Sequence, residues 1–257
     1  MTTKGSKSRG GKGKVRADAL LAAQGLTDSR TRAQSHIMAG NVYLGERRIN
    51  KPGEMLPAES ILDLRSPDHP WVSRGGLKLE HAMAHFDISV TNLVCLDVGA
   101  STGGFTDVLL TNGAAKVYAV DVGKGQLAWK LRNNPRVVTL EGTNARHLTA
   151  DDVPELVNIV VCDASFIGLE KVLPAPLQRA LPGAYLIALI KPQFQAGRDQ
   201  IGKGGVVRDP DIHQAVCESV QHWLEVDLSW RGIGVAESPI TGPKGNKEFL
   251  IVAQAPG

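Results

Sequence analysis

The sequence of 257 residues has few cysteines and no long apolar run. Its three cysteines, Cys95, Cys162 and Cys217, are odd in number and far apart, which argues against a disulfide framework or a bound metal. The longest apolar run, residues 184–190, is far shorter than the roughly 20 residues that span a bilayer. We therefore expect reduced thiols, a cytoplasmic location, no metal and no contact with a membrane.

An excess of either charge is also missing, because the formal net charge is only +3. The charges are nevertheless unevenly distributed. Residues 1–78 carry 14 Lys and Arg against 7 Asp and Glu, whereas the remaining 179 residues carry 15 against 19. A basic front predicts contact with nucleic-acid phosphates, although a basic tail kept for solubility would give the same imbalance.

The front of the chain reads as a disordered tail followed by a small α+β domain. Residues 1–14 are Gly, Ser and Lys of low complexity, which predicts disorder. A short Ala/Leu-rich helix is expected from Val15 to Gln24, closed by Gly25, and a second helix from Asp28 or Ser29 to Gly40. Short strands joined by tight turns follow at residues 42–44, 47–49 and 61–64. We place this domain at residues 15–64.

Basic side chains cluster in this domain. Arg30 and Arg32 lie in the first turn of the second helix, where cations oppose the helix dipole and so need another reason to be there. Arg47 and Arg48 lie on the hairpin, and Lys51 lies in the following turn. The stretch from SRTRAQSHIMAGNVYLG through the KPG turn resembles the S4 RNA-binding domain. The resemblance implies that these five residues bind RNA, whereas a solvated basic face is the alternative.

The rest of the chain predicts an α/β domain at residues 75–257, reached through a linker at 65–74 that has two prolines and no periodicity. Trp71 is apolar within this polar linker, so we expect it to dock against one of the domains. Helices are expected at 75–86 and 210–224. Strands are expected near residues 93–97, 116–121, 136–140, 158–163, 184–190, 226–235 and 248–254. This alternation predicts a mostly parallel Rossmann-like sheet with helices on both faces, whose ligands bind at the carboxyl ends of the strands.

A glycine-rich loop after the first strand of this domain predicts a cofactor site. The pattern D-x-G-x-x-x-G, which begins at Asp97, lacks the G-x-G-x-x-G core of dinucleotide binders, and an acid there would repel a diphosphate but attract an ammonium group. This favours S-adenosylmethionine, with Asp121 at the ribose, although a tight structural turn is the alternative. The predicted cofactor residues are Asp97, Gly99, Ser101, Thr102, Gly103, Gly104, Phe105, Asp121, Val122, Asn144 and Asp163.

Four charged residues form the predicted catalytic set. Asp163 ends the fourth strand, Lys191 ends the fifth and Glu248 begins the last. Lys78 lies beside the apolar stripe of helix 75–86 and is free to face the site or solvent. Taken singly, each is more often a surface charge. The glycine-rich basic loop after Lys191 predicts an RNA-facing lid, with the RNA contacts Phe194, Arg198 and Lys203.

Several motifs together resemble the TlyA family, historically called haemolysins, over about residues 15–254. They are RGGLKLEHA, LDVGASTGGFTD, VYAVDVGKGQL, VVCDASFIGL, ALIKPQFQAGRD and KGGVVRDP. The resemblance implies an FtsJ-type methyltransferase that uses S-adenosylmethionine to methylate a ribose 2′-hydroxyl, of cytidine, in ribosomal RNA of the small or large subunit. The Lys-Asp-Lys-Glu tetrad of that type would fall on Lys78, Asp163, Lys191 and Glu248. We expect a monomer.

The role of Lys191 stays open at this point. A general base would need a pKa well below the usual lysine value of about 10.4, which burial or a second cation such as Lys78 could supply. A charged Lys191 would instead orient the hydroxyl and stabilise its developing anion. The competing functions are a haemolysin-type lytic factor, a non-catalytic RNA-binding scaffold and an S4-linked pseudouridine synthase.

Overall fold

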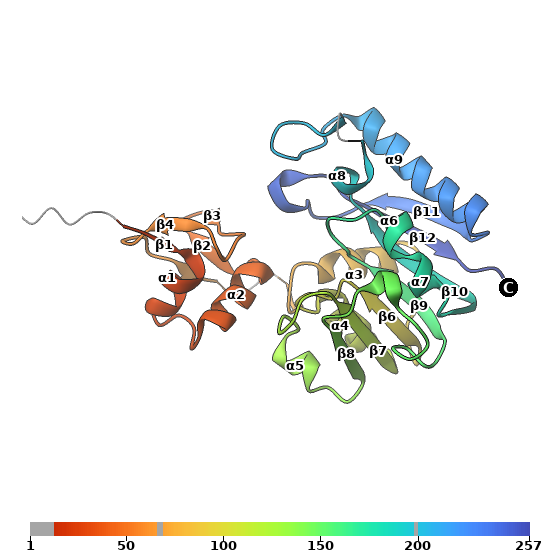
Figure 1. The fold of residues 1–257 in the computed structure, drawn as a ribbon, viewed down its shortest axis with the longest axis horizontal. Helices are drawn as coiled ribbons and strands as arrows, with labels where there is room; N and C mark the ends of the chain where they lie inside the picture. Colours follow the sequence, from red (N-terminus) through yellow and green to blue (C-terminus); the bar gives the residue numbers. More distant parts are fainter. Residues whose placement is uncertain (1–12, 66–68, 198–199) are drawn as a thin grey trace, which may run out of the picture. The chain divides into compact units, whose positions relative to one another are not determined.

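The computed structural model describes residues 13–65, 69–197 and 200–257. The chain divides into two compact units, Met1–Asp68 and His69–Gly257, and each is described by itself (Figure 1). Twelve residues of the predicted disordered tail, 1–12, lie outside the described residues, as does Arg198 of the predicted RNA contacts.

The first unit packs two helices against short antiparallel strands. Strand β1 (Lys14–Arg16) pairs with β4 (Met55–Pro57), and β2 (Val42–Leu44) pairs with both β3 (Arg47–Arg48) and β5 (Asp63–Leu64). Helix α1 (Ala17–Ala23) precedes α2 (Arg30–Ala39). The Oγ of Ser29 accepts from the N–H of Arg32 at the start of α2, and Gly40 ends it with φ of 84°, as their residue types predict. Leu21, Ile37, Val42 and Ile49 form its core.

Two expectations for this unit were wrong. Lys14 was placed in the disordered tail and Val15 at the start of a helix, but residues 14–16 form strand β1 and the helix begins only at Ala17. The strand β4, with which β1 pairs, was not predicted. Both strands have three residues and pair across about 40 residues of sequence, so no local periodicity marks them.

The second unit is built on one seven-stranded sheet. Its order is β11-β12-β10-β9-β6-β7-β8, with β12 antiparallel to both its neighbours and the other pairs parallel. The strands are β6 (Val94–Val98), β7 (Lys116–Asp121), β8 (Val137–Glu141), β9 (Val157–Cys162), β10 (Ala180–Ile190), β11 (Arg231–Glu237) and β12 (Phe249–Gln254). The predicted mostly parallel α/β sheet is confirmed.

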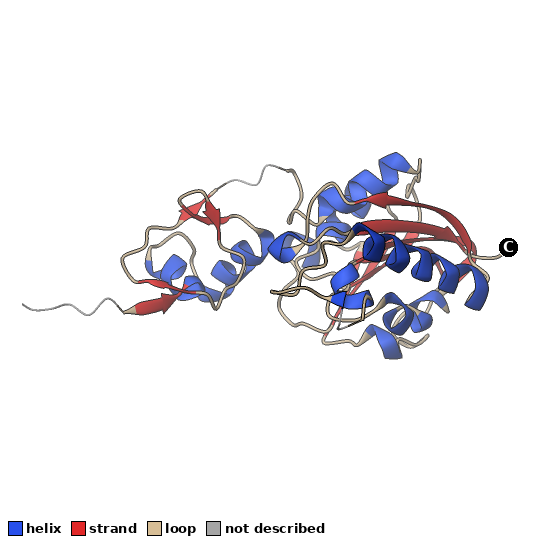
Figure 2. Cartoon of the chain, turned by 90° about the horizontal axis from the view of Figure 1, so that it is seen from above, coloured by secondary structure: helices blue, strands red, loops and turns tan. Residues whose placement is uncertain are grey.

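Helices cover both faces of this sheet (Figure 2). They are α3 (Gly76–His85), α4 (Gly104–Thr111), α5 (Trp129–Arg132), α6 (Leu169–Val172), α7 (Pro174–Leu177), α8 (Pro192–Gln195) and α9 (Pro210–His222), with 3₁₀ turns at Ala145–His147 and Pro243–Gly245. Strand β10 serves both layers, because Ile187 packs into the core that contains α3 and α4, whereas Leu186 packs into the core that contains α9. This alternation is that of a strand buried on both faces.

Two segments differ from expectation. The helix predicted at 210–224 continues as a π-helical turn, Trp223–Asp227, so the strand expected from residue 226 begins only at Arg231.

Trp71 docks as predicted. Its ring is buried in the core with Leu79, and its Nε1 donates to Glu80 Oε2 at 3.2 Å. Within the described residues, no helix is both long and apolar enough to span a bilayer.

Candidate active site

The carboxyl ends of the parallel strands surround a cavity of about 770 Å³. Because parallel strands end at the same edge of the sheet, the loops after β6, β7, β8 and β9 all contribute to its wall. The lining includes six predicted cofactor residues: Gly99, Ser101, Asp121, Val122, Asn144 and Asp163. It also includes Gln126, Ser165 and Phe166, which the sequence analysis did not select.

Five predicted cofactor residues do not line the cavity: Asp97, Thr102, Gly103, Gly104 and Phe105. Phe105 belongs to the hydrophobic core. A Cβ on Gly103 would lie 2.3 Å from the side chain of Leu131, and one on Gly104 would lie 2.9 Å from the backbone of Gly76. These two glycines therefore let helices pack closely onto the loop. At Gly99, φ is +83° and a Cβ would lie 3.0 Å from the backbone of Ala164, so this glycine lets two cavity loops meet.

Asp121 organises the wall between the first two strands. Its Oδ2 accepts from the N–H of Ser101 at 2.8 Å, and its Oδ1 accepts from the N–H of Gly123 at 2.7 Å. Ser101 adopts a positive φ of 49°, which costs energy for a residue with a side chain and is stabilised here by that hydrogen bond. Each carboxylate oxygen keeps a further lone pair, which could accept from the hydroxyls of a ribose.

Glu141, at the end of β8, fixes the loop that follows Asp121. Its two oxygens accept from the backbone N–H groups of Gly125, Gln126 and Leu127 at 2.8–3.0 Å, and Oε2 lies 2.7 Å from Arg132 Nη2. Burial alone would raise the pKa of Glu141, but these donors lower it to about 2. The loop carries Val122 and Gln126 into the cavity wall, so Glu141 supports the site although it is not part of it.

Asp97 is fully buried beneath the glycine-rich loop. Thr106 Oγ1 donates to its Oδ2 at 2.6 Å, while Oδ1 has no hydrogen-bond partner within the described residues. Burial raises the pKa of Asp97 to about 7, with the hydrogen bond from Thr106 working against it and the charges of Asp163 and Asp121 adding to it. A buried carboxylate oxygen without a donor is costly, and a cationic ligand nearby would relieve that cost.

The four predicted catalytic residues come together. Lys78 Nζ lies 2.8 Å from Glu248 Oε2 and 3.3 Å from Asp163 Oδ2, and Lys191 Nζ lies 2.6 Å from Asp163 Oδ1. Lys78 lies in the first turn of α3, and Asp163 directly follows β9. Lys191 directly follows β10, and Glu248 directly precedes β12. Lys78, Lys191 and Glu248 are only 7%, 6% and 1% exposed. Lys78 thus faces the site and not solvent.

The charges in this cluster stabilise one another. Burial works to lower the pKa of Lys78, but Asp163 and Glu248 together hold it above its usual value. Burial likewise works to raise the pKa of Asp163, but Lys191 and Lys78 hold it below its usual value. Lys78 therefore stays an ammonium and Asp163 a carboxylate at neutral pH.

Lys191 has two further partners in the segment after β9. Its Nζ donates to the backbone carbonyl of Asp163 at 3.1 Å and to Ser165 Oγ at 2.7 Å. The contact with Asp163 Oδ1 is an ion pair, and among the residues that the structure describes this oxygen has no hydrogen-bond partner. Ser165 was not predicted, and its only sequence signal is its place two residues after a predicted catalytic aspartate at a strand end.

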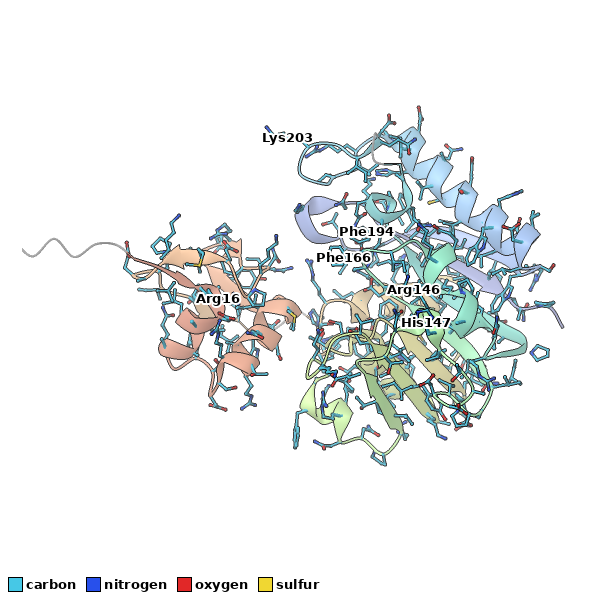
Figure 3. The ribbon with its side chains drawn as sticks, viewed as in Figure 1. Arg16, Arg146, His147, Phe166, Phe194 and Lys203 are labelled. Carbon is cyan, nitrogen blue, oxygen red and sulfur yellow. The ribbon has the colours of Figure 1, made fainter. Side chains whose placement is uncertain are left out.

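Two aromatic rings meet at the cavity wall. Phe166 is 89% exposed, has a φ of 67° and lies with its ring centroid 5.0 Å from that of Phe194 in α8 (Figure 3). An exposed ring held on strained backbone is unusual for a residue without a function. Phe194 was predicted as an RNA contact, whereas Phe166 was missed. Lys203, also predicted, is exposed and directed outward from the loop before α9.

The predicted RNA contacts of the first unit are mostly paired within the unit. Arg32 pairs with Asp28, Arg47 pairs with Glu54 at 2.6 Å, and Arg48 donates to the hydroxyl of Tyr43. Arg30 lies 3.2 Å from the buried Asp18, as its Nε–Oδ2 distance shows. Lys51 is exposed.

Asp18 also accepts two hydrogen bonds from Arg16. Arg16 (labelled in Figure 3) was not among the RNA contacts predicted from the sequence. The hydrogen bond from Arg16 has the largest effect on the pKa of the Asp18 carboxyl group. Together with the hydrogen bonds from Gln34 and Arg30, it outweighs burial and holds the pKa of Asp18 well below its usual range. Guanidinium groups have five N–H donors each, so these pairings leave donors for phosphates.

No cluster of three or more metal-ligating side chains occurs among the residues that the structure describes.

Known proteins match this chain over most of its length. The sequence pattern of the FtsJ-like methyltransferase family matches residues 71–255. The chain is 46% identical to the candidate rRNA methyltransferase YqxC of Bacillus subtilis, over 95% of this chain and 87% of that protein.

The chain is also 46% identical to the 16S/23S rRNA (cytidine-2′-O)-methyltransferase TlyA of Mycobacterium tuberculosis, over 93% of this chain and 89% of that protein. A solved structure of a candidate hemolysin from Streptococcus thermophilus superposes with a TM-score of 0.74 at 44% identity. That comparison covers 95% of this chain and 90% of the other.

Proposed function

Because the chain belongs to the FtsJ-like methyltransferase family, within the TlyA/hemolysin A group, we propose that it methylates the ribose 2′-hydroxyl of cytidine in ribosomal RNA, with S-adenosylmethionine as methyl donor. The observation that carries this proposal is the buried cluster of Lys78, Asp163, Lys191 and Glu248 beside the cavity. It supplies charged groups that can orient a weak oxygen nucleophile and stabilise its developing charge.

The residues at the cavity fit the donor. Asp121 offers free lone pairs to ribose hydroxyls, and we propose that Val122 and Asn144, which line the cavity, frame the adenine ring. Asp97 does not line the cavity, but its buried Oδ1, which has no hydrogen-bond partner within the described part of the chain, suits the positive charge of the methionine ammonium. When bound, the donor supplies an electrophilic methyl group on a sulfonium.

Lys191 acts as an ammonium in this proposal. Its Nζ lies 2.6 Å from Asp163 Oδ1 and donates to the carbonyl of Asp163 and to Ser165 Oγ, and these oxygen acceptors suit a donor of hydrogen bonds. The ammonium orients the 2′-hydroxyl for in-line attack and stabilises the negative charge that develops on its oxygen. The hydroxyl proton leaves late, to solvent. Lys78, which is itself paired with Glu248, contacts Asp163 and so helps to fix the carboxylate that lies beside Lys191.

Recognition of the RNA involves both units. Phe166 and Phe194 offer ring faces at the cavity, on which a base displaced from its helix could stack. We propose that residues 15–64 act as an S4-like RNA-binding domain, in which Arg30, Arg32, Arg47, Arg48 and Lys51 contact phosphates, with Lys203 and Arg198 in the second unit. The enzyme acts on ribosomal subunits, as a monomer in the cytoplasm; the three free cysteines agree with a reducing compartment.

Two other readings find less support. A lytic factor should carry an apolar span or a strongly amphipathic surface helix, and no membrane-spanning helix occurs in the described residues. A non-catalytic scaffold would not need Lys78, Asp163, Lys191 and Glu248 buried in contact, because such a charge cluster costs desolvation energy that an RNA-binding role does not require.

The test uses purified protein, methyl-labelled S-adenosylmethionine and bacterial small and large ribosomal subunits that lack the modification. We expect alkali-resistant linkages to appear at cytidine. Asp163→Asn should abolish them, whereas Asp151→Asn, an exposed loop aspartate, should not. The proposal fails if every ribose stays unmodified. The lytic reading would replace it if purified Lys191→Ala protein still lysed vesicles.

A further inference from the structure

Ser165 is a polar residue at the cavity whose place the catalytic set does not explain. It follows Asp163 by two residues, its side chain lines the cavity, and the residue is exposed. Its Oγ is nevertheless 2.7 Å from the buried Nζ of Lys191. A serine on an exposed loop would ordinarily turn its hydroxyl to water, because water satisfies it at no cost in rotamer freedom.

Ser165 is also the link between Lys191 and the cavity. Lys191 is not part of the cavity lining, whereas Asp163 and Ser165 are. A ribose oxygen that approaches Lys191 from the cavity therefore passes within reach of the Ser165 hydroxyl. After accepting from Lys191, that hydroxyl still has its own proton to donate.

The hydrogen bonds of Lys191 set the direction of its remaining N–H bond. An ammonium has three N–H bonds, and two of them are directed, one to the carbonyl of Asp163 and one to Ser165. The third is left for the ion pair with Asp163 Oδ1 and for an incoming oxygen. Without Ser165 one of the two directed hydrogen bonds is lost, and the group could rotate about its Cε–Nζ bond while keeping the ion pair with Asp163.

We propose that Ser165 is a positioning residue for methyl transfer: its hydroxyl fixes the rotation of the Lys191 ammonium so that one N–H bond is presented to the substrate hydroxyl. This inference rests on the proposed function, because it assigns Ser165 to the same reaction. It assigns no proton transfer to Ser165. The residue acts through Lys191, by restricting the orientations in which the hydroxyl can be held.

The test compares Ser165→Ala, Ser165→Cys and Ser165→Thr with Ser219→Ala, an exposed serine on α9. Single-turnover methylation of ribosomal subunits gives the rate of the chemical step, and calorimetry gives the affinity for S-adenosylmethionine. We expect Ser165→Ala to lower the rate about tenfold or more, since a hydrogen bond to a charged group is lost. Ser165→Cys, a weak acceptor of similar shape, should lose nearly as much. Ser165→Thr, which keeps the hydroxyl, should stay within about threefold of wild type.

The split between rate and affinity separates positioning from a merely structural role. Ser165→Ala should lower the single-turnover rate while its affinity for S-adenosylmethionine stays at the wild-type value, and the hydroxyl of Ser165→Thr should restore the rate. Equal rate losses in Ser165→Ala and Ser165→Thr would contradict the proposal.

The remaining outcomes are decisive as well. Equal rates in Ser165→Ala and Ser219→Ala would overturn the inference while leaving the proposed function intact, since wild type is active in the same assay. A loss confined to RNA affinity would also overturn it. An inactive wild-type protein would instead refute the proposed function. If Ser165→Ala bound the cofactor poorly, the comparison of Ser165→Cys with Ser165→Thr would decide. A slower Cys variant would support the inference, whereas equal rates in the two variants would overturn it.

Discussion

Removal of Lys78 should destabilise the second unit strongly, because this side chain neutralises a carboxylate that has little other contact. Glu248 is 1% exposed. Besides the ion pair with Lys78, its carboxylate accepts a long hydrogen bond from Gln193 Nε2, at 3.5 Å. Removing one partner of a buried ion pair costs about 3–5 kcal/mol, since the other charge stays buried without compensation. For a unit of this size each kcal/mol shifts Tm by about 2–4 °C. Lys78→Met should therefore unfold about 6–20 °C below wild type.

Tryptophan fluorescence is a suitable assay, because all four tryptophans, Trp71, Trp129, Trp223 and Trp230, belong to the second unit. The matched control is Lys247→Met, which removes an exposed lysine paired with an exposed glutamate at 3.1 Å and should leave Tm almost unchanged.

The double variant Lys78→Met, Glu248→Gln should regain part of the loss, because no carboxylate is left without a partner at position 248. The reasoning is refuted if Lys78→Met and Lys247→Met unfold at the same temperature.

Two further carboxylates give predictions of opposite sign. The pKa of Glu141 is lowered to about 2, so its contribution to stability is complete above about pH 4.5 and is lost as the pH falls toward 2. Glu141→Gln should lack that acid-dependent loss of stability. Because the loop with Val122 and Gln126 loosens, this variant should also bind S-adenosylmethionine about tenfold more weakly in calorimetry. An unchanged affinity would contradict this role of Glu141. The pKa of Asp97 is raised to about 7, so its contribution is present below about pH 4 and is lost as the pH rises through 7. Asp97→Asn should therefore gain Tm over wild type between pH 5 and pH 9 without cofactor while losing cofactor affinity, and a gain that did not grow with pH would count against the burial argument.

The sequence predicted the sheet and placed three of the four candidate catalytic residues at one edge for a single physical reason. Parallel strands end at a common edge, so Asp163 after β9 and Lys191 after β10 were expected at the same edge, and the pairing of these two strands makes them neighbours. The orientation of Lys78 could not be predicted in this way. A helix pattern shows which residues avoid the apolar core, but the carboxylates that bury Lys78 lie 85 and 170 residues away along the chain.

The glycine-rich loop shows a second limit. Glycine at positions 99, 103 and 104 gave one signal in the sequence, yet the three have different physical causes. Gly99 lets two loops at the cavity meet, whereas Gly103 and Gly104 make room for Leu131 and for the start of α3. Likewise Ser165 and Glu141 have ordinary sequence contexts, because their roles depend on partners brought close only by the fold.

The arrangement of charges indicates where the catalytic effect of this site would arise. Asp163 lies between Lys78 and Lys191 and contacts both, so the positive charge of Lys78 acts on Lys191 chiefly through the carboxylate that they share. Asp163 and Ser165 surround the Nζ of Lys191 with oxygen acceptors, so this lysine is arranged as a donor. A donor held in this way can orient the hydroxyl and stabilise its developing anion, and these are the effects that preorganised charges supply most efficiently.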